Sequence, residues 1–289
     1  MDMKTAEILC NVTSDFYRAQ AASFSATRTS PWHGWRRCVA AMAEALGVTD
    51  CVEGGIVHGE AAADGGVGEG ARRAADAGVR PGVSVFDLAC GNLRFERYLA
   101  EALPHACVRA YAVDSCDELA ADAGGLEIPV TYESSDIVGG LIAGAPLHEL
   151  HHAPQVDMAV SFGFLHHVPG EDLRVRVLDG LIDAVRPGGC VAVSLWQFMN
   201  NPTLAAKACV AHAQAGEALG LAADAFDEGD YLLGWKNVEG AWRYCHHFSD
   251  EEVDRLVNAV STRAHLVDMF EADGRTGAMN KYLVLQRRR

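Results

Sequence analysis

The feature that most constrains the fold is an alternation that begins at Val83. Short runs of β-branched and apolar residues alternate there with amphipathic segments of helical periodicity, which is typical of βαβ units and a parallel sheet. The expected strands are Ser84–Leu88, Arg109–Val113, Val130–Glu133, Val156–Phe162, Cys190–Trp196, His265–Phe270 and Tyr282–Gln286. The expected helices between them are Arg94–Leu103, Asp172–Val185 and Glu251–Val260. Only Glu271–Lys281 separates the last two strands, which favours a hairpin with one antiparallel strand near the sheet edge.

Two segments precede this pattern. Apolar residues from Thr5 to Leu46 are spaced as in helices, with a break at Ser30-Pro31 and a second helix from about Trp32. We expect residues 1–50 to form an N-terminal helical cap. Residues 51–82 are rich in Gly, Ala and acids, which indicates a surface excursion with one short helix near Ala71–Ala77. Residues 83–289 are then the sheet domain, and the whole chain is expected to form one structural domain.

The net charge of the chain limits which kinds of partner it can bind. The formal net charge of 289 residues is −15, which disfavours a nucleic-acid substrate because phosphates are bound mainly by Lys and Arg. A local basic face is compatible with this total. No apolar stretch is long enough to span a membrane, and Met1–Thr5 does not begin a secretory signal. We therefore expect a soluble, cytoplasmic protein without a membrane partner.

Cysteine and histidine spacing does not indicate a metal site. The nine cysteines include no Cys-x-x-Cys pair, and most are expected to be reduced core residues. The histidines occur as adjacent pairs, and neighbouring residues on a strand point to opposite faces. On this basis we expect no metal ion.

The turn at Phe86–Asn92 follows the first strand and leads into a helix, which is where open parallel sheets bind ligands. The next strand ends at Asp114, where an acid can accept both hydroxyl groups of a ribose. Ser135 and Asp136 follow the third strand and can face the amine of adenine. Each acid also has a structural alternative, since Asp87 can brace the turn, Asp114 can be a solvated strand end and Asp136 can cap a helix. Their order and spacing favour an adenosine pocket.

These residues, together with Pro187-Gly188-Gly189 before the fifth strand, resemble the class I S-adenosylmethionine-dependent methyltransferases. The resemblance implies a seven-stranded Rossmann-like α/β sheet with helices on both faces, and S-adenosylmethionine as cofactor. It implies cofactor contacts from Asp87, Ala89, Gly91, Asn92, Asp114, Ser135, Asp136 and Phe162. Ala89 and Leu93 stand where the family has glycine. The turn tolerates alanine if its φ is negative, and Leu93 is expected to restrict the approach of the methionine part.

A closer resemblance is to the tRNA wobble-uridine carboxymethyl methyltransferases. It rests on Phe24–Trp32, with its Phe-Ser-x-Thr-Arg and Pro-Trp core, on Cys90–Asn92, on Phe164–His167 and on Arg243–His246. This resemblance adds Phe24, Arg28 and Trp32 to the expected cofactor contacts. It also implies a carboxylate as the methyl acceptor.

The acceptor decides which residues are catalytic. A carboxylate attacks without losing a proton, so a cation such as Arg28 or Arg243 is the useful group. A hydroxyl or amine needs a base, for which His166, His167 and His246 are the candidates. Arg28 has two alternatives, which are to hold the cofactor's own carboxylate or to tie the N-terminal helix to the sheet. His167 has the alternative of a packed residue.

The leading hypothesis is a methyltransferase for a small or medium-sized acceptor. The alternatives are a tRNA wobble-uridine methyltransferase, a non-catalytic S-adenosylmethionine-binding protein and, less favoured, a nicotinamide-dependent dehydrogenase. The sequence does not predict the oligomeric state.

Overall fold

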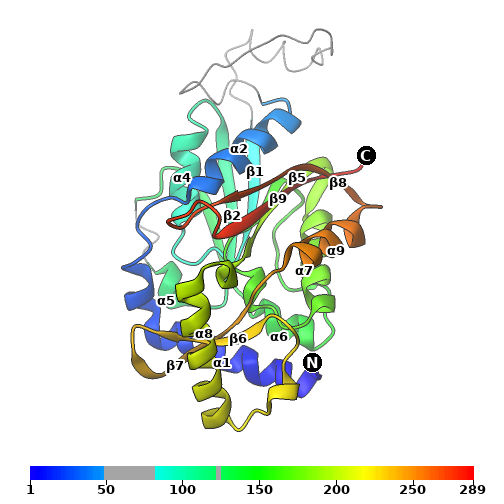
Figure 1. Ribbon diagram of the computed structural model, residues 1–289. Coiled ribbons are helices and arrows are strands. Elements are labelled where there is room, and N and C mark those ends of the chain that lie inside the picture. The colour runs from blue at the N-terminus through cyan, green and yellow to red at the C-terminus, as the bar shows by residue number, and fades with distance from the viewer. Residues whose placement is uncertain (49–81, 122–124) are drawn as a thin grey trace, which may run out of the picture.

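A seven-stranded sheet forms the centre of the computed structural model, which describes residues 1–48, 82–121 and 125–289 (Figure 1). Its strands are β1 (Gly82–Leu88), β2 (Cys107–Asp114), β3 (Val130–Ser134), β4 (Val156–Ser161), β5 (Val185–Trp196), β8 (Ala264–Ala272) and β9 (Asn280–Arg287). The order is β3-β2-β1-β4-β5-β9-β8, and β9 runs antiparallel to both of its neighbours. The predicted α/β sheet with one reversed strand near its edge is confirmed.

Helices cover both faces of the sheet. On one face lie α2 (His33–Ala45) and α4 (Arg94–Ala102), and on the other lie α6 (Ile137–Ile142), α7 (Glu171–Ala184) and α9 (Asp250–Val260). Successive residues of β1 point to opposite faces, so Val85 packs with α2 and α4 whereas Phe86 packs with α7. Each large apolar side chain buried in this way stabilises the fold by roughly 1.5–3 kcal/mol.

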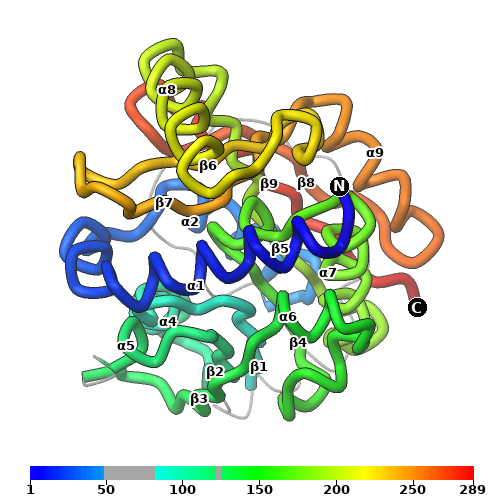
Figure 2. Tube along the Cα trace, turned by 90° about the horizontal axis from the view of Figure 1, so that it is seen from below, coloured from blue at the N-terminus to red at the C-terminus, as the bar shows by residue number. Residues whose placement is uncertain are grey.

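A second layer lies beyond the carboxyl ends of the parallel strands, where α1 crosses the molecule beside a small sheet (Figure 2). It consists of α1 (Met3–Ser25), α8 (Pro202–Leu219) and the antiparallel pair β6 (Asp230–Trp235) and β7 (Val238–His246). Leu9, Ala215, Leu232 and Tyr244 form its buried core. The two helices expected as one N-terminal cap therefore lie in different layers, since α2 packs on the sheet. The sequence reading did not anticipate α8, β6 or β7.

The short helices are α5 (Asp117–Ala120), η2 (Leu147–Glu149), η3 (Leu165–His167), η4 (Phe198–Asn200) and η5 (Ala223–Ala225). The helix expected near Ala71–Ala77 lies outside the described residues. Within the described ranges, none of the helices has the length and apolar character that a bilayer crossing requires.

A buried ionic network holds β7 against the sheet domain. His246 lies between two carboxylates, with Nδ1 2.7 Å from Asp230 Oδ1 and Nε2 2.6 Å from Glu252 Oε2. Glu252 also pairs with Arg174 at 2.9 Å, and the Tyr244 hydroxyl donates to Asp230 at 2.7 Å. Burial alone would lower the pKa of His246, but the hydrogen bonds to the two carboxylates outweigh it and raise that pKa. Both ring nitrogens therefore act as donors, as in an imidazolium.

Candidate active site

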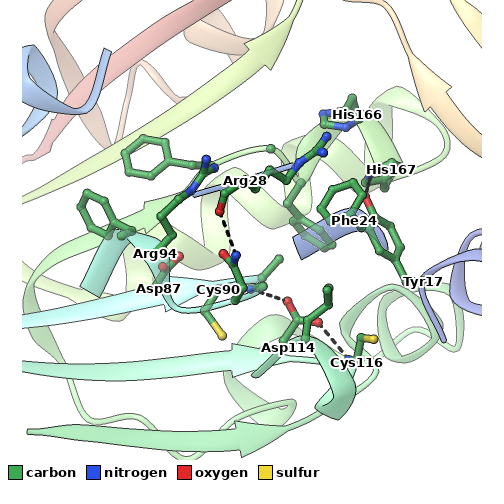
Figure 3. A pocket seen from close by; sticks show the side chains of 18 of the residues that line it. Tyr17, Phe24, Arg28, Asp87, Cys90, Arg94, Asp114, Cys116, His166 and His167 are labelled. Atoms are coloured by element: carbon green, nitrogen blue, oxygen red, sulfur yellow. Dashed lines mark hydrogen bonds between the residues drawn. The ribbon is translucent and has the colours of Figure 1, made fainter. Parts of the chain in front are cut away.

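A cavity of about 620 Å³ lies between the carboxyl ends of the strands and the second layer, a size typical of small-molecule sites. Its floor is the β1–α4 turn (residues 87–92) with Asp114, Ser135 and Asp136, and its roof is Tyr17, Phe24, Arg28, His166 and Arg243. Figure 3 shows Cys90 and Asp114 below, with Phe24, Arg28 and His166 above them. The carboxyl ends of parallel strands are where this type of sheet binds ligands.

Three residues between β1 and α4 are left-handed, Ala89 at φ 64° and Gly91 at φ 55° in the turn and Leu93 at φ 56° directly after it. The backbone N–H groups of Ala89 and Cys90 both donate to the carbonyl of Val113, at 2.7 and 3.1 Å. The condition that alanine needs a negative φ here was wrong, because the hydrogen bonds to β2 impose the left-handed form on it. That conformation costs an alanine roughly 1–2 kcal/mol.

Leu93 does not restrict the cavity, contrary to expectation. Its side chain is 1% exposed and packs with Cys90 and Ala112. It therefore fills the space between the turn and the sheet, and it is absent from the cavity lining.

Asp114 is held by the backbone at both of its oxygens. Oδ2 accepts from the Gly91 N–H at 2.8 Å, and Oδ1 accepts from the Cys116 N–H at 2.9 Å (Figure 3). Burial raises the pKa of Asp114 against the lowering effect of these bonds. A carboxylate has about four acceptor positions, so Asp114 keeps acceptor capacity for two further donors in the cavity.

A pair of carboxyl groups lies under the turn. Asp87 is 3% exposed and lines the cavity, and Glu96, which the sequence reading missed, is 0% exposed behind it. Burial and the neighbouring Glu96 raise the pKa of Asp87 well above its usual range. Burial also raises the pKa of Glu96 to about 7. Near neutral pH the two carboxyls therefore hold at least part of a proton between them.

The two residues after β3 have local partners as well as cavity positions. Ser135 Oγ donates to the Leu150 carbonyl at 2.7 Å, and Asp136 Oδ1 accepts from the Gly139 N–H at 2.9 Å as the N-cap of α6. The capping alternative for Asp136 is therefore present, and both side chains still line the cavity. Phe162, just after β4, lines it too and packs edge-on against Phe95.

The segment between α1 and α2 covers the turn. Asn92 Nδ2 donates to the Arg28 carbonyl at 3.1 Å, which joins the roof to the floor. The Arg28 guanidinium lies 3.5 Å from the ring centroid of Phe24, and its side chain extends toward His166 (Figure 3). Burial lowers the pKa of Arg28 to about 10. Trp32 also lines the cavity, and its ring centroid lies 5.2 Å from the guanidinium carbon of Arg94.

Three arginines face the cavity without an acidic partner. Arg28, Arg94 and Arg243 all line it, and none forms an ion pair with a carboxylate of the described residues. Arg243, on β7, is only 6% exposed, donates weakly to the Gly234 carbonyl at 3.4 Å, and has its guanidinium carbon 5.0 and 5.4 Å from the ring centroids of Phe16 and Trp235. Arg94, which the sequence reading missed, donates to the Ser30 carbonyl at 2.8 Å and leaves Nε unpartnered.

His167 has both ring nitrogens occupied. Nδ1 lies 2.6 Å from the Tyr244 carbonyl, which can only accept, so Nδ1 carries the proton and Nε2 accepts from the Tyr17 hydroxyl at 2.8 Å. Burial lowers the pKa of His167 to about 3. This arrangement is that of a neutral, packed histidine that fixes α1 against β7. Tyr17, which the sequence reading also missed, lines the cavity and is held there by its hydrogen bond to His167.

His166 is different, because its buried Nδ1 has no hydrogen-bond partner among the described residues. Its ring lies 5.0 Å from that of Trp196 and lines the cavity. Burial, followed by the positive charges near it, lowers the pKa of His166 well below its usual value. It is a neutral polar group in the lining of the cavity. His246, by contrast, does not line the cavity.

The expectation that adjacent histidines diverge was wrong for His166 and His167. They lie in the 3-10 helix η3, not on a strand, and their ring centroids are 4.1 Å apart. One ligand atom of each, with the Cys245 sulfur, lies within 4.8 Å of the others. A metal cation is nevertheless disfavoured there, because His167 has no free nitrogen and Arg28 and Arg243 place positive charge beside the cluster.

Solved structures provide the comparison with known proteins. The DhpI-SAM-HEP complex matches 96% of this chain and 97% of its own at 19% identity, with a TM-score of 0.55. A SAM-dependent methyltransferase from Methanosarcina mazei matches 74% of this chain and 96% of its own at 17% identity, with a TM-score of 0.51. The chain has the class I methyltransferase fold. No protein-family model matches the sequence, and no curated protein is similar to it.

Proposed function

We propose that the chain is an S-adenosylmethionine-dependent methyltransferase whose acceptor is a small molecule carrying a carboxylate. The observation that carries the proposal is the charge pattern of one cavity, which has acids in its floor and unpaired arginines around and above it. S-adenosylmethionine is cationic at its sulfonium and ammonium groups, so it suits the floor. An anionic acceptor suits the roof.

The floor residues fit this cofactor one by one. The free acceptor positions of Asp114 suit the two ribose hydroxyls, and Ser135 and Asp136 suit the adenine amine. Asp87 suits the ammonium group. Arg94 follows the turn directly and lines the cavity, and its guanidinium suits the carboxylate of the methionine part. When bound, the cofactor would supply its methyl carbon for an in-line displacement in which its sulfur is the leaving group.

The roof residues act on the acceptor. A buried guanidinium without a counter-ion is unfavourable. An acceptor carboxylate between Arg243 and Arg28 relieves that penalty, and the two guanidinium groups orient the acceptor. Alignment in a closed cavity is a large part of what methyl transfer requires. Phe24 and Trp196 supply apolar walls.

A base is not needed for a carboxylate acceptor. His166 can hydrogen-bond the acceptor as a neutral group, but its lowered pKa makes it a weak proton acceptor. His167 is committed to Tyr17 and Tyr244. We therefore assign His166 to positioning and His167 to structure.

The second candidate is a tRNA wobble-uridine carboxymethyl methyltransferase, which Phe24–Trp32 and Arg243–His246 favour by resemblance. The same two arginines suit that carboxylate. The net charge of −15 argues against it. Binding of tRNA that rises steeply as salt is lowered supports this candidate, and absence of binding at low salt removes it.

The test uses S-adenosylmethionine with a labelled methyl group and the small-molecule fraction of a cell extract. A carboxylate acceptor yields a methyl ester, which mild alkali converts to volatile labelled methanol. Alkali-stable label indicates a hydroxyl or amine acceptor and contradicts the carboxylate. Calorimetric titration with S-adenosylhomocysteine is the companion measurement. Absence of binding at millimolar concentration contradicts the whole proposal, and binding without any transfer indicates a non-catalytic protein.

A further inference from the structure

Glu96 is the buried acid that the proposed function leaves unused. It lies in the first turn of α4 and is 0% exposed, and the group beside its carboxyl is the Asp87 carboxyl, to which it is hydrogen-bonded when one of the two carries a proton. Burying an acid without a cation beside it is unfavourable. Nothing in the packing of α4 requires an acid here, since the neighbouring Phe95 and Leu99 are apolar core residues.

The carboxyl of Asp87 lies beside that of Glu96. Asp87 lines the cavity, and Glu96 lies behind it. No ion pair joins a lysine or arginine to either acid within the described part of the chain. Two adjacent carboxyls without a cation cannot both ionise easily. The pair therefore lacks one positive charge, and its open side is the cavity.

We propose that Asp87 and Glu96 together bind the ammonium group of the cofactor's methionine part and release a proton to solvent when they do so. Asp87 makes the contact, and Glu96 is a positioning residue that acts through Asp87. This inference rests on the proposed cofactor. It goes beyond it by assigning a second acid and a proton to the binding step.

Other titratable groups face the pair. Asp114 at the end of β2 disfavours ionisation of both acids, and Arg97 on α4 favours ionisation of Glu96. The Cys90 thiol lies in the turn, and burial raises its pKa well above its usual value, so it stays neutral. A bound ammonium adds the positive charge that these neighbours do not supply, and it favours the doubly ionised pair. The proton that the two carboxyls shared is therefore released to solvent.

The experiment is calorimetric titration of the full chain with S-adenosylhomocysteine at pH 6, 7 and 8, in two buffers of different ionisation enthalpy. The native protein should release a proton near neutral pH, and its affinity should rise with pH, by at most about tenfold per unit for one proton. Glu96→Gln should bind without that release and with a flat pH profile, because glutamine does not ionise. Glu101→Gln, at an exposed position of the same helix, is the matched control and should behave as the native protein.

Two further measurements keep the outcomes separate. 5′-Methylthioadenosine lacks the ammonium group, so it should bind without proton release even to the native protein. Glu96→Leu replaces the acid by an apolar side chain and should also remove the release if circular dichroism shows it folded. Equal proton release by native protein and Glu96→Gln overturns the inference while leaving the proposed function intact. Failure of the native protein to bind S-adenosylhomocysteine overturns the proposed function instead.

Discussion

The floor and the roof of the cavity are built in opposite ways. The floor is acidic and is fixed by backbone hydrogen bonds within one strand–turn–helix unit and its neighbour β2, as at Asp114. The roof is basic and combines α1, the following segment and β7, which are distant in sequence. A cavity with two oppositely charged halves can hold a cationic donor and an anionic acceptor at once. The floor should therefore govern cofactor binding, and the roof should govern the acceptor.

The largest expected effect is on Arg243. Arg243→Met should lower kcat/KM for the acceptor by about 100- to 1000-fold, because removing one partner of a buried charge pair costs roughly 2–5 kcal/mol. Binding of S-adenosylhomocysteine, measured by calorimetry, should be unchanged. Arg109→Met, at an exposed position on β2, is the control. Weakened cofactor binding in Arg243→Met would contradict the assignment of cofactor binding to the floor and acceptor binding to the roof.

The network behind the roof comes next. His246→Gln should lower the free energy of unfolding by about 3 kcal/mol, because it leaves the buried Asp230 without its cation and Glu252 with Arg174 alone. The pKa of His246 is raised in the folded protein, so its stabilisation is complete below the unfolded value and fades as the pH rises through the folded one. Urea unfolding between about pH 6 and 9 should therefore show a difference between the two proteins that shrinks with pH. A constant difference would show that His246 stabilises without its charge.

Asp114 tests the floor. Asp114→Asn should weaken S-adenosylhomocysteine binding by about 10- to 100-fold, since hydrogen bonds to a charged group contribute roughly 1.5–3 kcal/mol. The KM for the acceptor should change little at saturating cofactor. If the acceptor KM rises as much as the cofactor affinity falls, the two halves of the cavity are not separate sites.

The smallest effect concerns the turn itself. Ala89→Gly should raise the free energy of unfolding by about 1 kcal/mol, because glycine adopts φ 64° without the alanine penalty. Ala213→Gly, in the exposed middle of α8, should have the opposite sign and lower it by roughly 0.5–1 kcal/mol. Urea unfolding measures both. Destabilisation by Ala89→Gly would mean that the backbone hydrogen bonds do not impose the left-handed form.

The floor could be predicted from sequence because its signals are local. Asp87, Ala89 and Asp114 stand at strand ends, where the alternation of strand and helix fixes their place, and the cavity lies there. Glu96 and Arg94 escaped notice because the first turn of a helix is ordinarily a solvated position for charged residues. Only the tertiary structure shows that both are turned inward.

The roof was harder to predict. Arg28 and Arg243 entered through resemblance, and nothing local indicates that they meet. The strands β6 and β7 lie in a region without clear alternation, and α8 is rich in alanine with few apolar anchors. They are held by tertiary contacts, because β7 packs on α1, with Leu9 and Tyr244 in one buried cluster, and α8 packs on β6. The environment of His166 and His167 likewise depends on a 3-10 turn that no periodicity announces.

The hydrogen bond from Asn92 to the Arg28 carbonyl has a consequence for the order of events. It joins the turn proposed to bind the donor to the segment that carries Arg28, a cation proposed to bind the acceptor. With the donor on the floor and the acceptor under the roof, as proposed, a bound acceptor obstructs exchange of the donor. We therefore expect a compulsory sequence in steady-state kinetics, with the donor entering first and its demethylated product leaving last. That product should then inhibit competitively against the donor and non-competitively against the acceptor.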